Sequence, residues 1–180
     1  IRHDPRSREL ARLQIRNGVN LRPGQRLHIK GMPVCCAGYA RLLVEEAYEA
    51  GAADVTVSYD DAAISRLRYL HASDESLDDW YGYPAETVEK MIARGDCELV
   101  IFGSDPRAFE GCDPKRIRRA NEARRKITEA LDNAHVMMRI RRCTTAVPTP
   151  AWAREVFPDL SEEKALEALW DSVFAAFRIT

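Results

Sequence analysis

The 180-residue sequence has no long hydrophobic run, since charged or polar residues interrupt every apolar stretch. A helix needs about 20 consecutive, mainly apolar residues to cross a bilayer, so neither a membrane-spanning segment nor a membrane partner is predicted. A secretory leader, in which a charged start precedes an apolar stretch, is also missing from the residues that follow Ile1.

Zinc-ligand and disulfide patterns are missing too. The number of cysteines is odd, one pair is adjacent, and no two stand in a C-x-x-C arrangement. This pattern fits neither a disulfide framework nor a zinc site. It favours free thiols in a reducing compartment, so we expect a cytoplasmic protein. The cysteines are Cys35, Cys36, Cys97, Cys112 and Cys143.

No charge of one sign dominates, because 27 Lys and Arg residues stand against 28 Asp and Glu residues. A formal net charge of −1 provides no overall attraction to nucleic acid, so no nucleic-acid partner is predicted. The strongest basic run lies within 113–132, where an apolar stripe and interspersed glutamates indicate a solvated helix face. Arg118 and Glu122, like Arg125 and Glu129, have the i,i+4 spacing of ion pairs.

Motifs for catalysis and cofactor binding are missing as well. The sequence contains neither G-x-S-x-G, the nucleophile turn of many hydrolases, nor G-x-G-x-x-G, the dinucleotide-binding turn. The acidic neighbours Asp60 and Asp61 point apart on a regular element, and we interpret Asp60 as a helix cap. The four histidines are scattered, and none lies four residues from another; they are His3, His28, His71 and His135. No catalytic residue and no metal ligand is therefore predicted within the chain, and His28 is interpreted as structural.

The pattern that is present is an alternation of helices and strands. Short strands are predicted at 27–29, 55–57, 99–102 and 136–140, and the run Leu99–Phe102 is apolar throughout, as in a strand covered on both faces. Helices long enough for parallel crossovers separate them. The predicted fold class is α/β, a mostly parallel sheet with helices on both faces, in a three-layer arrangement like Rossmann or flavodoxin folds. The helices are expected at 6–17, 37–50, 60–71, 84–94, 113–132, 151–156 and 161–179.

Five segments, in order, resemble the amino-terminal domain of the thermophilic metalloaminopeptidases of the aminopeptidase T, aminopeptidase S and aminopeptidase II type. They are Leu10–Leu27 (LARLQIRNGVNLRPGQRL), Leu42–Asp54 (LLVEEAYEAGAAD), Ser65–Ala72 (SRLRYLHA), Asp113–Lys126 (DPKRIRRANEARRK) and Pro148–Phe157 (PTPAWAREVF). The last is the most specific of the five. The resemblance extends through almost the whole chain.

This resemblance implies a two-domain protein in which 1–180 is the non-catalytic amino-terminal domain. The implied activity is the removal of amino-terminal residues from peptides by two divalent metal ions, which are cobalt, zinc or manganese. In the family the metal ligands and the catalytic residues lie in the carboxy-terminal domain, so none is assigned to a position in this sequence. The implied partners are that second domain, peptide substrates and a second copy of the protein, with which it forms a dimer around an internal cavity.

Five residues near the carboxyl end of the sequence are candidates for contact with the second domain, with packing in the domain's own core as the alternative for Trp152 and for part of the last helix. They are Pro148, Pro150, Trp152, Trp170 and Phe174. A free-standing α/β module that binds a small ligand is the alternative function. The chain departs from the family pattern at Cys35-Cys36, which stand at a predicted helix entry; we interpret both as packing residues.

Overall fold

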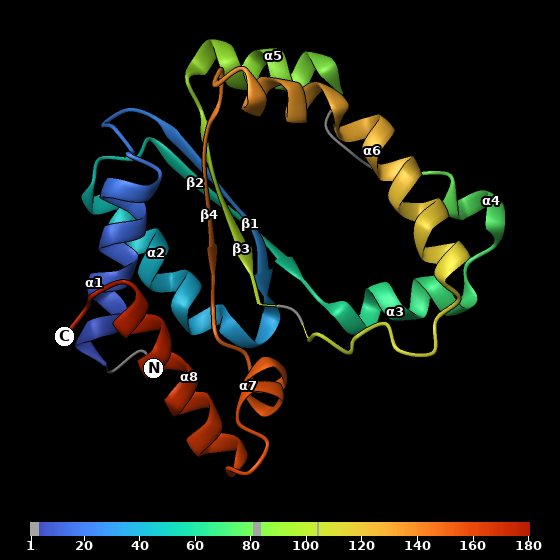
Figure 1. Cartoon of the computed structure of the whole chain (residues 1–180). Helices are drawn as coiled ribbons and strands as arrows, with labels where there is room; N and C mark the ends of the chain where they lie inside the picture. The colour runs from blue at the N-terminus through green and yellow to red at the C-terminus, as the bar shows by residue number, and fades with distance from the viewer. Residues whose placement is uncertain (1–3, 81–83, 104) are drawn as a thin grey trace. The chain divides into compact units, whose positions relative to one another are not determined.

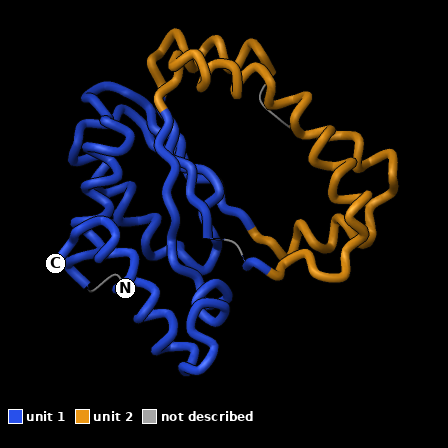
Figure 2. Tube along the Cα trace, in the orientation of Figure 1, with its two compact units in different colours: residues 1–60, 97–106, 142–180 blue, residues 61–96, 107–141 orange. Residues whose placement is uncertain are grey.

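A computed structural model describes residues 4–80, 84–103 and 105–180. Its chain forms two compact units, which Figure 2 distinguishes by colour. Unit 1 consists of Ile1–Asp60, Cys97–Pro106 and Arg142–Thr180, and unit 2 consists of Asp61–Asp96 and Arg107–Arg141. The place of 1–180 as the amino-terminal domain of a longer protein stays a prediction.

The sheet has four strands in the order β2-β1-β3-β4 (Figure 1). Strand β1 runs parallel to both of its neighbours, so that Leu27 lies opposite Val55 on one side and Cys97 on the other. The α/β class and the mostly parallel sheet are therefore confirmed. The strands are β1 (Arg26–Pro33), β2 (Asp54–Asp60), β3 (Cys97–Phe102) and β4 (Arg141–Ala146).

Helices α1, α2 and α8 of unit 1 pack on one face of this sheet. Leu27 and Ile29 of β1, with Leu99 and Ile101 of β3, point to the same face because strand side chains alternate. They form one buried cluster with apolar side chains of α1, α2 and α8. The helical elements of this unit are α1 (Pro5–Leu13), a π-helical turn (Gln14–Gly18), a 3₁₀ turn (Val34–Cys36), α2 (Ala37–Glu49), α7 (Pro150–Val156) and α8 (Glu162–Ala176).

Unit 2 is built from helices around two small apolar clusters. One cluster joins α5 and α6 through Val88, Met91 and Leu131, and the other joins α3, α4 and α6 through Tyr69, Leu77 and Ala120. Among the described residues of either unit, no helix is long and apolar enough to cross a membrane. The helices are α3 (Ala62–His71), α4 (Asp74–Leu77), α5 (Ala85–Arg94) and α6 (Pro114–Val136).

The predicted fourth strand at Val136–Ile140 is wrong. Helix α6 continues to Val136, and β4 begins at Arg141. The apparent alternation misled the prediction, because Met138 is 86% exposed and has a left-handed backbone, while Ile140 is buried against α5 and α6. The true strand, RRCTTA, is too polar to show an apolar period of two.

Two predictions about charged residues also need correction. Asp61, rather than Asp60, caps α3 by accepting a hydrogen bond from the backbone of Ala63 at 2.9 Å. The basic side of α6 is ion-paired, as the sequence suggested, but through other partners: Arg119 pairs with Asp74 and with Asp78 of the α4 region. Helix α4 therefore neutralises part of that basic face.

Candidate functional site

Three of the five predicted contact residues lie in the proline-rich connection between β4 and α7 and in the first turn of α7. Pro150 occupies the first turn of α7, and Thr149 caps the helix by accepting a hydrogen bond from the backbone of Trp152 at 3.3 Å. Proline suits this position because the first turn of a helix needs no intrahelical donor. Pro148 is buried, and its carbonyl accepts from the Cys36 thiol at a sulfur–oxygen distance of 3.6 Å. The connection is thereby fixed to the start of α2.

Trp152 is half-buried and packs on a small cluster between α7 and α8. That cluster contains Ala153, Ala165 and Leu169. Part of the indole is therefore available to another surface, as a residue at a domain contact requires.

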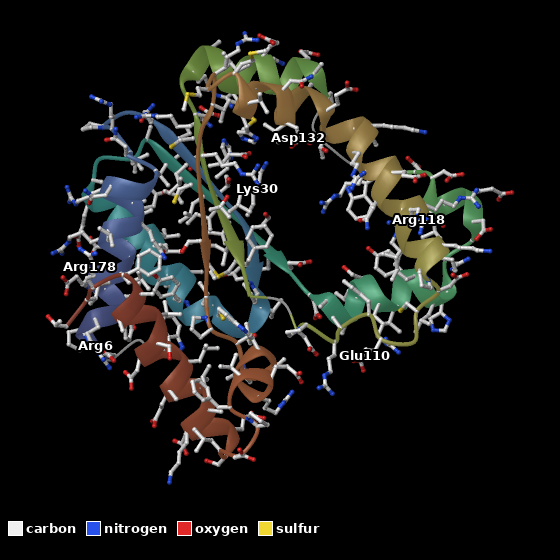
Figure 3. All side chains as sticks on the ribbon, in the orientation of Figure 1. Arg6, Lys30, Glu110, Arg118, Asp132 and Arg178 are labelled. Atoms are coloured by element: carbon white, nitrogen blue, oxygen red, sulfur yellow. The ribbon has the colours of Figure 1, made fainter. Side chains whose placement is uncertain are left out.

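Trp170 and Phe174 lie elsewhere, in the main core of unit 1. The Trp170 ring is 5.5 Å from Tyr39 and 5.4 Å from Phe174, centroid to centroid. The Arg6 guanidinium, labelled in Figure 3, lies 4.6 Å from the centroid of Phe174. The structure thus separates the five residues into two groups. Pro148, Pro150 and Trp152 lie at the start of α7, whereas Trp170 and Phe174 of α8 lie in the core of unit 1. Their contact with a second domain stays a prediction.

A buried hydrogen-bonded chain lies beside these rings. The Tyr39 hydroxyl donates to Gln14 Oε1 at 2.9 Å, and Gln14 Nε2 donates to Thr145 Oγ1 at 2.9 Å. The chain joins α2, the π-helical turn and β4. Burial raises the pKa of Tyr39 above its ordinary value of about 10.

Replacing Tyr39 with phenylalanine should change the response of stability to alkali. As the pH rises, the unfolded chain loses the Tyr39 proton first, so the stabilisation is complete below about pH 10 and is lost as pH rises toward the folded pKa. Tyr39→Phe should flatten this loss, and at neutral pH it should lower the free energy of unfolding by about 1–3 kcal/mol, because Gln14 Oε1 loses its donor. Urea unfolding at neutral and alkaline pH measures both effects.

The matched control is Tyr48→Phe, because Tyr48 lies on the same helix and is exposed. This variant should follow the wild type at every pH. If Tyr39→Phe lost stability in alkali as steeply as the wild type, the role given to its hydroxyl would be wrong.

A cavity of about 540 Å³ in unit 1 lies beside the two buried rings. Trp170 and Phe174 line it together with other residues from the start of α1 and from α8, namely Asp4, Arg6, Ser7, Glu163, Leu166, Glu167 and Asp171. Arg6 is held in place by Asp4 at 2.8 Å and by Asp171 at 3.0 Å. No local sequence pattern indicates this cavity, because it depends on α1 packing beside a helix some 160 residues further along the chain.

The histidine, cysteine and acidic side chains of the described residues form no metal site. Within residues 4–80, 84–103 and 105–180, no group of three or more His, Cys, Asp or Glu side chains is arranged to hold a metal ion. His28 contacts Thr56 Oγ1 at 2.8 Å on the neighbouring strand, as a structural residue would; His3 lies outside the described residues. All five cysteines are free thiols.

Comparisons with known proteins agree with one another. The thermophilic metalloprotease (M29) family matches residues 3–180. The chain is 37% identical over 180 residues to aminopeptidase T of Thermus thermophilus and 35% identical over 172 residues to aminopeptidase 2 of Geobacillus stearothermophilus. Each alignment covers 94% of this chain and 41% of the relative, so the chain spans about two fifths of the length of these curated relatives. The solved structure of wild-type AmpT from Thermus thermophilus matches with a TM-score of 0.84 at 35% identity, over 94% of this chain and 42% of the other.

Proposed function

Because the chain belongs to the thermophilic metalloprotease (M29) family, we propose that it is the amino-terminal domain of a two-metal aminopeptidase. The whole protein would remove amino-terminal residues from short peptides in the cytoplasm. One observation carries this proposal: relatives named as aminopeptidases align with nearly all of this chain, and the alignment takes up only 41% of their length.

The catalytic chemistry is assigned to the part of the protein beyond this domain. Two divalent metal ions, cobalt, zinc or manganese, would supply a metal-activated water and hold the charge that develops on the scissile carbonyl. The described residues of this chain offer no group of three metal-ligating side chains. Its residues would instead support the fold, the dimer and the cavity through which peptides enter.

The start of α7 is proposed as the main contact with the catalytic domain. Trp152 offers a partly exposed indole, and Thr149 and Pro150 fix the helix that carries it. Pro148 would restrict the backbone of the connection between β4 and α7, since the proline ring fixes φ. Trp170 and Phe174 would support this contact indirectly, because their buried rings anchor α8, on which α7 packs, in the core of unit 1.

Peptidase assays on the full-length protein and on the 180-residue chain test the proposal. The full-length protein should hydrolyse amino-acid p-nitroanilides when it is supplied with cobalt, zinc or manganese, and a chelator should abolish this activity. The 180-residue chain should be inactive. Calorimetric titration should give it no divalent-metal site with a dissociation constant of about 1 μM or tighter, because its His, Cys and carboxylate side chains are dispersed. Metal-independent hydrolysis by the full-length protein, or a tight site on the short chain, would contradict the proposal.

One observation favours the alternative of a small-ligand-binding module. The 540 Å³ cavity has the size of a small-molecule site. Two of its lining residues, Ser7 and Trp170, have buried polar atoms (Ser7 Oγ and Trp170 Nε1) that find no hydrogen-bond partner among the described residues. A small molecule that remains with the purified chain, together with a full-length protein that lacks peptidase activity, would support this second function.

A further inference from the structure

Two adjacent thiols lie where β1 passes into α2. Cys35 and Cys36 belong to the 3₁₀ turn Val34–Cys36, and their sulfur atoms are 3.8 Å apart. Cys35 is exposed, whereas Cys36 is only 8% exposed. One sulfur is therefore open to a reagent in solution, and the other stands behind it within contact distance.

We propose that Cys35 and Cys36 form a reversible modification site at which a peroxide oxidises the pair to a disulfide between adjacent residues. The distance between the sulfurs and their unequal exposure carry this proposal. The packing role that the sequence suggested explains the burial of Cys36, but it leaves the exposed thiol of Cys35 without a function.

The exposure of the two groups sets the order of the steps. The Cys35 thiolate attacks one peroxide oxygen, the O–O bond breaks, and Cys35 becomes a sulfenic acid while hydroxide leaves. The Cys36 sulfur then attacks the Cys35 sulfur, the S–S bond forms, and the S–O bond breaks. The departing hydroxide takes the Cys36 proton, so two thiols and one hydrogen peroxide give one disulfide and two water molecules.

The environment of Cys36 keeps this thiol from taking part in the first step. Burial, with a further contribution from Cys35, raises the pKa of Cys36 to about 12. Cys36 therefore remains a protonated thiol at neutral pH and does not compete for the peroxide. It reacts only after Cys35 has become an electrophile at 3.8 Å.

The backbone makes such a disulfide easy to reduce. Across a trans peptide bond the Cα atoms of neighbouring residues are about 3.8 Å apart, below the roughly 4.4–6.8 Å of ordinary disulfides. A strained and exposed disulfide has a high reduction potential and is readily reversed by thiols. The site would therefore respond to a peroxide pulse without lasting damage.

Oxidation would also release a neighbouring contact. In the reduced chain the Cys36 thiol donates to the carbonyl oxygen of Pro148. The disulfide has no S–H group, so this donor disappears. The connection between β4 and α7 would lose a link to the start of α2.

Peptide mapping of the 180-residue chain tests the proposal. The chain is treated with hydrogen peroxide at an equimolar amount, blocked with an alkylating reagent and digested with trypsin without reductant. Cleavage after Lys30 and Arg41 gives a fragment, residues 31–41, that contains both cysteines. We expect this fragment to be about 2 Da lighter than the reduced peptide and to carry no alkyl group, and dithiothreitol should restore both thiols.

Two single variants locate the reaction. Cys143→Ser removes a half-buried thiol elsewhere in unit 1 and should leave the mass loss unchanged. Cys36→Ser should abolish the loss and leave Cys35 to gain oxygen atoms, and circular dichroism checks that this variant is folded. The wild-type digest alone is decisive: cysteines that stay fully reduced, a cysteine that gains oxygen, or two chains linked through Cys35 would each overturn the proposal.

Discussion

Replacing Phe174 with alanine should lower the free energy of unfolding by about 3–5 kcal/mol. The side chain is 2% exposed and packs against Trp170 in the core of unit 1. Truncation leaves a cavity that the rigid neighbouring rings cannot fill, and lost dispersion adds to the lost hydrophobic transfer energy. It also removes the ring beneath the Arg6 guanidinium. Urea unfolding followed by circular dichroism measures the change.

Phe177→Ala is the matched control for this experiment. Phe177 is the residue immediately after α8 and is 39% exposed. Its truncation should cost less than about 1 kcal/mol, because little buried volume is lost. Equal losses in the two variants would show that Phe174 does not belong to the core of unit 1, and would weaken its role as a support for a neighbouring domain.

Gly31→Ala is expected to be destabilising by about 2–5 kcal/mol. Gly31 lies in β1 with a φ of +72°, and an added Cβ would stand 2.7 Å from the carbonyl oxygen of Ile101 in β3. The left-handed backbone costs about 1–2 kcal/mol for alanine, and moving a buried strand to relieve the clash adds about 1–3 kcal/mol. Thermal and urea unfolding should both report the loss.

Gly24→Ala separates the two contributions to that loss. Gly24 has a similar φ of +83°, and its added Cβ would meet no described atom within 4 Å. This variant should show the backbone cost alone, about 1–2 kcal/mol. If Gly31→Ala were no worse than Gly24→Ala, β3 would have to move aside freely, and the close approach of the two strands would not matter for stability.

The fold was predicted best where side-chain periodicity agrees with the residues that end helices and form turns. Three of the four predicted strands are confirmed, because their apolar residues face the core, as the apolar run of β3 illustrates. The end of α5 is also correct, since Gly95 adopts the left-handed conformation that a helix end requires. Strand β4 was missed because its inward Thr145 binds Gln14 through a hydrogen bond instead of apolar packing.

The candidate site was only partly predictable. The helix predicted at 151–156 matches α7 to within one residue, because Pro150 and the capping Thr149 set its start through local geometry. The burial of Trp170 and Phe174 could not be read from α8 alone, since Val173 and Phe177 compete for the same inward stripe. The partner helices α1 and α2 decide which rings enter the core. For the same reason the thiol contact between Cys36 and Pro148, 112 residues apart, has no local signal.

The division of the chain into two units has a consequence for folding kinetics. Strands β1 and β3 pair at Leu27 and Cys97, and much of the chain between these residues belongs to unit 2. Such non-local pairing raises contact order, and the entropy of closing a long loop is lost before the strand pair is gained. The central ladder should therefore form late, after local helix pairs have shortened the effective loop. Unit 2 enters unit 1 as two separate insertions, 61–96 and 107–141, so no single deletion or circular permutation can separate it from the sheet.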